Sequence, residues 1–179
     1  MTVLEGIMRR RSVRRYDGRA VPDDEIRTIL TAGGAAPIGM GRFDDMHMTV
    51  VTDRDRLSEI GKRVGEAMSR ILQRENAPFD FYGASTLVLI SSREAVLPGI
   101  DYTDAGGVAE NMMIQAAADG LGSCIIWASG SAVDSDEDLR RALRIPDGFH
   151  PLFGIVFGYA ADEPGSRDAD VPRIASDVI

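Results

Sequence analysis

The sequence predicts an α+β domain in which helices surround a central sheet of four or five strands. Short apolar runs, typical of strands, alternate along the chain with longer segments of helical periodicity. One of these helical segments is apolar on almost every side, as expected for a helix enclosed in the interior. At 179 residues the chain has the length of one domain and can bury a core without disulfides or metals. We therefore expect residues 1–179 to form a single domain.

The first half of the chain predicts two helices, a strand and a long helix, in that order. Residues 2–11 carry apolar side chains at helical spacing, and a second helix over 21–34 opens with Pro22 and three acidic residues. A strand over 47–53 follows. Residues 55–75 then place apolar side chains on one face of the long helix.

The second half predicts three strands and two further helices. Residues 104–119 form the helix that is apolar almost all round, with Asp104 as its N-terminal cap and Gly120 as its stop. The apolar run at 86–92 is typical of a strand that is buried on both faces. The remaining elements are expected as strands at residues 123–129 and 151–160 and a polar helix at residues 133–143.

The chain is acidic, with a formal net charge of -8 and a pI of about 4.8. This argues against a general binder of nucleic acid or of anionic membranes, because both require an attractive field for phosphate. Cys124 is the only cysteine, which excludes an internal disulfide. The N-terminal arginines precede no apolar stretch typical of a signal peptide, and no apolar run approaches the roughly 20 residues of a membrane helix. We expect a soluble, cytoplasmic protein.

In this acidic chain, positive charge gathers in the segment RRRSVRR, residues 9–15. Arg10, Ser12 and Arg14 alternate, so in an extended backbone their side chains point the same way. Guanidinium groups make forked, charge-assisted hydrogen bonds to phosphate, and a serine hydroxyl adds another donor. The pattern therefore predicts that these three side chains bind one phosphate group. Two alternatives remain open: a solvated run of charge, and a basophilic kinase site, since residues 9–13 match Arg-Arg-x-Ser-apolar.

Other familiar chemical motifs are absent from the sequence. No G-x-G-x-x-G follows a strand and there is no Walker loop, although the small residues of AAPIGMG, residues 35–41, would let a backbone lie against a flat cofactor. Cys124 falls in a predicted buried strand, and His47 and His150 lack the spacing of metal ligands. No nucleophile elbow occurs. If the protein is an enzyme, its reactive group is expected to be a bound cofactor, with no metal and no catalytic side chain.

Three segments are similar, in chain order, to the nitroreductase-like flavoproteins. RRRSVRRYDGRAVPDDEIRTILTAGGAAP resembles the opening of that family, an Arg-Arg-Ser-x-Arg-x-aromatic stretch followed by a helix that ends in Ala-Pro. DAGGVAENMMIQAAADGLGSC resembles its central helix, and LRIPDGFHPLFGIVFGY resembles its closing strand. The resemblance spans nearly the whole chain. It implies the nitroreductase-like fold, with a mixed, mainly antiparallel sheet, and an intertwined homodimer.

The resemblance also implies an activity and a set of cofactor-binding residues. It implies FMN at the homodimer interface and two-step (ping-pong) transfer of reducing equivalents, with flavin N5 as the reactive centre. NADH or NADPH would be the reductant, and a small electron-poor molecule such as a nitroaromatic or a quinone the acceptor. The residues matched to the phosphate and ribityl end are Arg10, Ser12 and Arg14, with Arg11 assisting through its backbone and Arg167, or Arg173 in its place, as second phosphate arginine. The residues matched to the isoalloxazine and its N5 edge are Ile125, Ile126 and Trp127.

One loop departs from the family pattern. Many members have Ser-x-x-Asn-x-Gln-Pro-Trp after the Ala-Pro, whereas residues 37–44 here read PIGMGRFD. Pro37, Gly39 and Gly41 are therefore expected to meet the cofactor through the backbone. The missing asparagine, glutamine and tryptophan leave open a flavoprotein of the same fold with other chemistry, such as dehalogenation, dehydrogenation or flavin cleavage. A further alternative is a non-enzymatic protein that binds a nucleotide or anion through the arginines.

Overall fold

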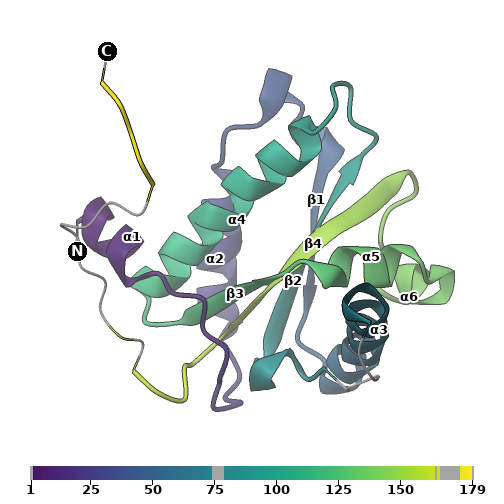
Figure 1. Cartoon of the computed structure of the whole chain (residues 1–179), viewed down its shortest axis with the longest axis horizontal. Coiled ribbons are helices and arrows are strands. Elements are labelled where there is room, and N and C mark those ends of the chain that lie inside the picture. Colours follow the sequence, from purple (N-terminus) through teal and green to yellow (C-terminus); the bar gives the residue numbers. More distant parts are fainter. Residues whose placement is uncertain (1, 74–78, 164, 166–173, 179) are drawn as a thin grey trace.

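The computed structural model describes residues 2–73, 79–163, 165 and 174–178 (Figure 1). Its helices are α1 (Val3–Arg9), α2 (Asp23–Gly34), α3 (Arg54–Leu72), α4 (Ile100–Ala118), α5 (Ala128–Asp134) and α6 (Glu137–Ala142). Its strands are β1 (Met46–Val51), β2 (Thr86–Arg93), β3 (Gly122–Ile126) and β4 (Phe149–Gly158). Short 3-10 turns occur at η1 (Gly39–Gly41), η2 (Phe43–Asp45) and η3 (Phe81–Gly83). Within the described residues, no helix combines the length and the apolar character needed to cross a bilayer.

The four strands form one antiparallel sheet in the order β1-β2-β4-β3. Side chains alternate along β2, so that Leu87 and Leu89 enter a core beneath α3 and α5, while Val88 and Ile90 enter a second core beneath α2 and α4. Figure 1 shows these two helix layers on opposite sides of the sheet. The predicted α+β fold is confirmed, and β2 is buried on both faces as its apolar run predicts.

The helix starts follow the local chemistry of the sequence. Thr2 and Glu5 form a capping box at α1, in which each side chain accepts a hydrogen bond from the other residue's backbone N–H. The side chain of Asp53 accepts from the Arg56 N–H at the start of α3, and Gln73 closes α3 in the left-handed conformation. These helices begin and end within about three residues of their predicted bounds.

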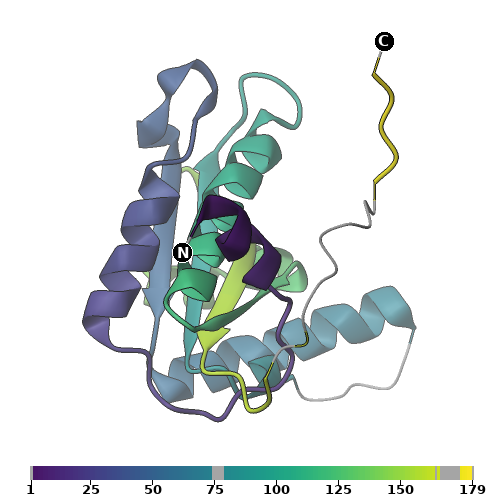
Figure 2. The same cartoon turned by 90° about the vertical axis from the view of Figure 1, so that its left-hand side faces the viewer.

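The prediction that Asp104 caps the central helix is wrong. Helix α4 begins one turn earlier, at Ile100, after Gly99 in the left-handed conformation with φ 81°. Nothing in the residues between Gly99 and Asp104 opposes a helix, and Asp104 instead accepts a hydrogen bond from the Gly39 N–H at 3.0 Å. The helix is covered on its inner side by α2 and the sheet and has α1 in front of it (Figure 2), but Tyr102, Thr103 and Gly106 are exposed, so it is less enclosed than predicted.

The predicted strand at 123–129 and the predicted helix at 133–143 are also corrected. Strand β3 ends at Ile126, and a separate helix, α5, occupies residues 128–134 before α6. The apolar run continues past Ile126 and therefore resembles a longer strand. The helix packs closely on β4: at Gly130 a Cβ would lie 2.0 Å from the Leu152 carbonyl oxygen, so glycine permits the close approach.

Candidate functional site

The arginine segment lies in extended conformation against the open edge of β3. The Val13 N–H donates to the Ser123 carbonyl at 2.9 Å, and Ser12 forms a parallel bridge with Ser123. Val13 is buried, and a Cβ at Gly122 would lie 2.7 Å from its side chain, so this glycine makes room for it. Ser12 and Arg14 flank Val13 and are exposed, so the predicted alternation holds for these two residues.

The arginines of this segment differ in what they contact. Arg10 is turned toward α4, where its Nε lies 3.1 Å from Glu110 Oε1. Arg11 Nε donates to the Gly165 carbonyl at 2.7 Å. Arg14 makes no ion pair or hydrogen bond to any described residue, which leaves its guanidinium available to an anion. Arg15 is paired with Asp162.

Two buried groups beneath the segment have perturbed acidities. Burial raises the pKa of the Tyr16 hydroxyl well above its usual value, with smaller contributions from Cys124 and Tyr82. Burial likewise raises the pKa of the Cys124 thiol, and Arg14 partly opposes this effect. A buried thiol with a raised pKa is a poor nucleophile. Cys124 therefore offers no alternative to cofactor chemistry.

The other end of β3 presents a backbone edge and an aromatic surface. Ile125 is two residues after Ser123, so its N–H and C=O point to the same open edge, and its side chain is exposed. Trp127 makes stacked ring contacts with Tyr102 of α4, at 5.2 Å between centroids, and with Phe153 of β4, at 5.8 Å, and is itself 62% exposed. Ile126 is buried. Tyr102, at 42% exposure, therefore also remains accessible in part.

The arginine segment and the end of β3 lie on one side of α4. Around an α-helix, Glu110 lies about 80° from Tyr102, so the partner of Arg10 and the partner of Trp127 share a side. Asp104, which binds Gly39, lies about 160° from Tyr102. The structure therefore brings Arg10, Ser12, Arg14 and residues 125–127 together along β3, and leaves Pro37, Gly39 and Gly41 on the far side of α4.

In the loop that carries Pro37, Gly39 and Gly41, the backbone N–H groups of both glycines already make hydrogen bonds within the chain. Gly39 donates its N–H to Asp104, and Gly41 donates to the Ile38 carbonyl at 3.0 Å. A Cβ at Gly39 would lie 2.4 Å from the Ile100 side chain. Pro37 is exposed. Since both amides are already used, this loop can offer a ligand its carbonyls, its surface and its side chains.

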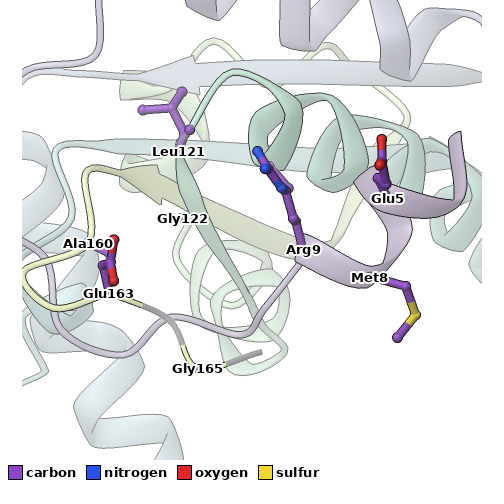
Figure 3. A pocket seen from close by; sticks show the side chains of 10 residues that line it. Glu5, Met8, Arg9, Leu121, Gly122, Ala160, Glu163 and Gly165 are labelled. Atoms are coloured by element: carbon purple, nitrogen blue, oxygen red, sulfur yellow. The ribbon is translucent and has the colours of Figure 1, made fainter. Parts of the chain in front are cut away.

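A cavity of about 640 Å³ lies beside the arginine segment without including any predicted site residue. Figure 3 shows its walls, which come from α1, from the turn between α4 and β3, and from the chain after β4. Arg9 extends from α1 toward the turn after α4 (Figure 3). Glu5 and Glu163 also line it. Because Arg9 is outnumbered by these two carboxylates, the cavity does not favour binding of a phosphate.

Sequence reasoning missed Glu110 and Tyr102. Glu110 stands in the quoted central-helix segment directly before Asn111, whose side chain donates to the Ala32 carbonyl of α2 at 3.2 Å. Its place in that segment could have identified Glu110 from the sequence, whereas nothing in the sequence pairs Tyr102 with Trp127. The predicted phosphate arginines Arg167 and Arg173 lie outside the described residues. Among the described residues, no group of three or more His, Cys, Asp or Glu side chains could hold a metal ion.

Comparisons with known proteins agree with the resemblance seen in the sequence. Residues 7–159 match the model of the Nitroreductase family. A relative from Methanothermobacter thermautotrophicus, provisionally named NADH dehydrogenase/NAD(P)H nitroreductase, is 31% identical over 94% of this chain and 82% of its own length. The FMN reductase (NADPH) of Bacillus subtilis is 24% identical over 98% of this chain and 71% of its own. A crystal structure of a nitroreductase with bound FMN from Bacteroides fragilis superposes with a TM-score of 0.85, at 28% identity, over 100% of this chain and 99% of that one.

Proposed function

The chain belongs to the Nitroreductase family, and from this premise we propose that it is an FMN-dependent NAD(P)H oxidoreductase that reduces a small electron-poor acceptor. The observation that carries the proposal is the arginine segment, fixed in extended form on the β3 edge with Arg14 unpaired among the described residues. The FMN of the Bacteroides fragilis structure supports the choice of cofactor. We propose that residues 1–179 act as one domain and that the protein is cytoplasmic.

The residues along β3 fit an FMN molecule in chemistry. Arg10, Ser12 and Arg14 would hold the phosphate, because they supply forked cationic donors and a hydroxyl. The residues proposed for the ring lie at the other end of the strand, since the chain from Ser123 to Trp127 extends about 13 Å. The exposed backbone edge at Ile125 offers hydrogen bonds to a flat polar ring. Arg11, Ile126 and Arg167, or Arg173 in its place, remain proposed contacts from the family match.

When bound, FMN supplies the reversible two-electron chemistry that the side chains of this site lack. The chain's own residues would bind FMN and orient it. The arginines neutralise the phosphate locally, so the chain's net charge of -8 does not prevent binding, because solvent screens the more distant carboxylates. No described side chain at the site is assigned a proton-transfer role.

We propose a homodimer in which the loop with Pro37, Gly39 and Gly41 reaches the partner's site. On its own chain this loop lies across α4 from β3, so it meets a cofactor on β3 only from a second copy. Exposed apolar side chains on α1, on the turns at 39–45 and on the loop at 94–99 are available to such an interface: Val3, Leu4, Met40, Phe43, Val96 and Leu97.

Replacing Tyr102 by alanine is expected to weaken the use of aromatic acceptors. The exposed face of this ring extends the Trp127 stack, and an aromatic pair contributes about 0.5–1.5 kcal/mol beyond area burial, or roughly twofold to tenfold in KM. Steady-state kinetics with nitrobenzene and with ferricyanide would measure the effect. The KM should rise for nitrobenzene alone, and Tyr102→Phe, which keeps the ring, should behave like the wild type. An equal rise for ferricyanide would contradict this role.

The visible absorbance spectrum of the purified protein, with and without added FMN, tests the proposed function. The expected result is the two-band spectrum of bound oxidised flavin, bleached by NADH or NADPH and restored by a nitroaromatic or a quinone. Bound flavin without turnover would favour dehalogenation, dehydrogenation or flavin cleavage on the same fold. A chain that binds no flavin would instead support a nucleotide- or anion-binding role for the arginines.

A further inference from the structure

Glu110 of the central helix contacts an arginine that the proposed function places on the FMN phosphate. Its Oε1 lies 3.1 Å from Arg10 Nε, and the side chains are 44% and 16% exposed, respectively. Arg10 follows the last residue of α1 and has left the helical conformation, with ψ 125°. Its backbone therefore does not fix the direction of its long side chain. The contact that the structure describes for its guanidinium is the one with Glu110.

We propose that Glu110 is a positioning residue for the cofactor, which holds Arg10 by its Nε edge and leaves the two Nη groups facing the phosphate. This inference rests on the proposed function. A guanidinium carries five donors in a rigid plane, and carboxylate and phosphate can occupy different edges of that plane. The Nη groups of Arg10 make no hydrogen bond to any described residue. Nε is buried and makes no hydrogen bond, so its contact with Glu110 is an ion pair without hydrogen-bond geometry; the carboxylate attracts the guanidinium to this side of α4 and leaves both Nη groups without a described partner.

Two opposite effects of Glu110 decide the sign of the prediction. Its negative charge repels a nearby phosphate, and its contact with Arg10 removes the need to order a flexible side chain when FMN binds. The carboxylate is nearly half exposed, so solvent and salt screen the repulsion. The ordering of Arg10 is not screened, because it acts through direct contact. Preorganisation therefore outweighs repulsion.

A purely structural role for Glu110 would be to clamp α1 onto α4. Helix α1 buries only Gly6, so it depends on few contacts. Such a role would affect every ligand of the site alike. A role in positioning Arg10 affects only ligands that carry a phosphate, and FMN and riboflavin differ by that one group.

The test is a fluorescence titration of the flavin-free chain with FMN and with riboflavin. For Glu110→Ala we expect the Kd for FMN to rise about tenfold, while the Kd for riboflavin changes less than about twofold. Glu110→Gln keeps an oxygen near Nε and should retain most of the FMN affinity. The matched control is Glu59→Ala, because Glu59 pairs with Arg56 on α3 at a similar 49% exposure. It should change neither Kd.

The outcomes separate this inference from the proposed function. If the wild type binds FMN and Glu110→Ala leaves the ratio of the two Kd values unchanged, or tightens FMN binding, Glu110 does not position Arg10. If Glu110→Ala weakens both flavins equally, Glu110 is a clamp for α1. If the wild type binds neither flavin, the proposed function is wrong and this inference is overturned with it. Should Glu110→Ala not fold, Arg10→Ala decides: it should raise the Kd for FMN and leave the Kd for riboflavin unchanged, and an unchanged ratio of the two Kd values would overturn the positioning role, because Arg10 would then not hold the phosphate.

Discussion

Replacing Arg10 and Arg14 together by alanine is expected to leave a folded protein that no longer retains FMN. Each charged hydrogen bond to the phosphate contributes about 1.5–3 kcal/mol. Losing two therefore weakens binding by roughly 10²- to 10⁴-fold. Titration of the flavin-free double variant with FMN would measure the loss, and circular dichroism would check the fold.

The matched control removes the same amount of charge from within the segment and just after it. Arg15 and Arg19 are 70% and 65% exposed and pair with Asp162 and Asp17 within the chain. Arg15→Ala with Arg19→Ala should therefore keep FMN affinity within a few-fold of the wild type. Equal losses in the two double variants would show that the segment acts only through its total charge, and the residue-specific site would have to be abandoned.

Replacing Gly130 by alanine is expected to destabilise the fold strongly. The new Cβ would lie 2.0 Å from the Leu152 carbonyl oxygen and 2.3 Å from its carbon, and backbone atoms of a central strand cannot move aside without disturbing the sheet. Overpacking of this kind costs about 3 kcal/mol, or about 10 °C in Tm for a chain of this size. Thermal unfolding followed by circular dichroism would measure the shift.

Gly106 supplies the control for the Gly130 variant. It is an exposed helical glycine of α4, and a Cβ there meets nothing within 4 Å. Gly106→Ala should raise the stability by about 0.5–1 kcal/mol, because alanine has the higher helix propensity. Unfolding temperatures that fall alike in both variants would contradict the packing explanation for Gly130.

Much of the fold could be predicted because its signals are local and periodic. The apolar run of β2 identifies a strand buried on both faces, and the apolar surface of α4 identifies a helix of the core, whatever their neighbours. The errors fall where a distant contact decides. Helix α5 packs on β4 through Gly130, and α4 begins at Ile100, which leaves the Asp104 carboxylate inside the helix to accept from Gly39; neither contact is visible in the local pattern.

The candidate site divides in the same way. The alternation of Ser12 and Arg14 about a buried Val13 follows from extended geometry and could be predicted from the segment alone. The pairing of Arg10 with Glu110 joins residues a hundred positions apart in the sequence. The periodicity of the sequence does not indicate which face of α4 meets the end of α1, so this pair could not be predicted.

The cover that the arginine segment gives to β3 also bears on self-association. β3 is an edge strand, and an uncovered edge is a template on which a strand of another molecule can add. Residues 12 and 13 occupy the start of this edge, which leaves uncovered only the short stretch at 125–127. Three residues are too few to seed stable strand addition, and the neighbouring guanidinium charges repel a like segment of a second chain. The segment thus protects the β3 edge of the sheet against edge-to-edge aggregation.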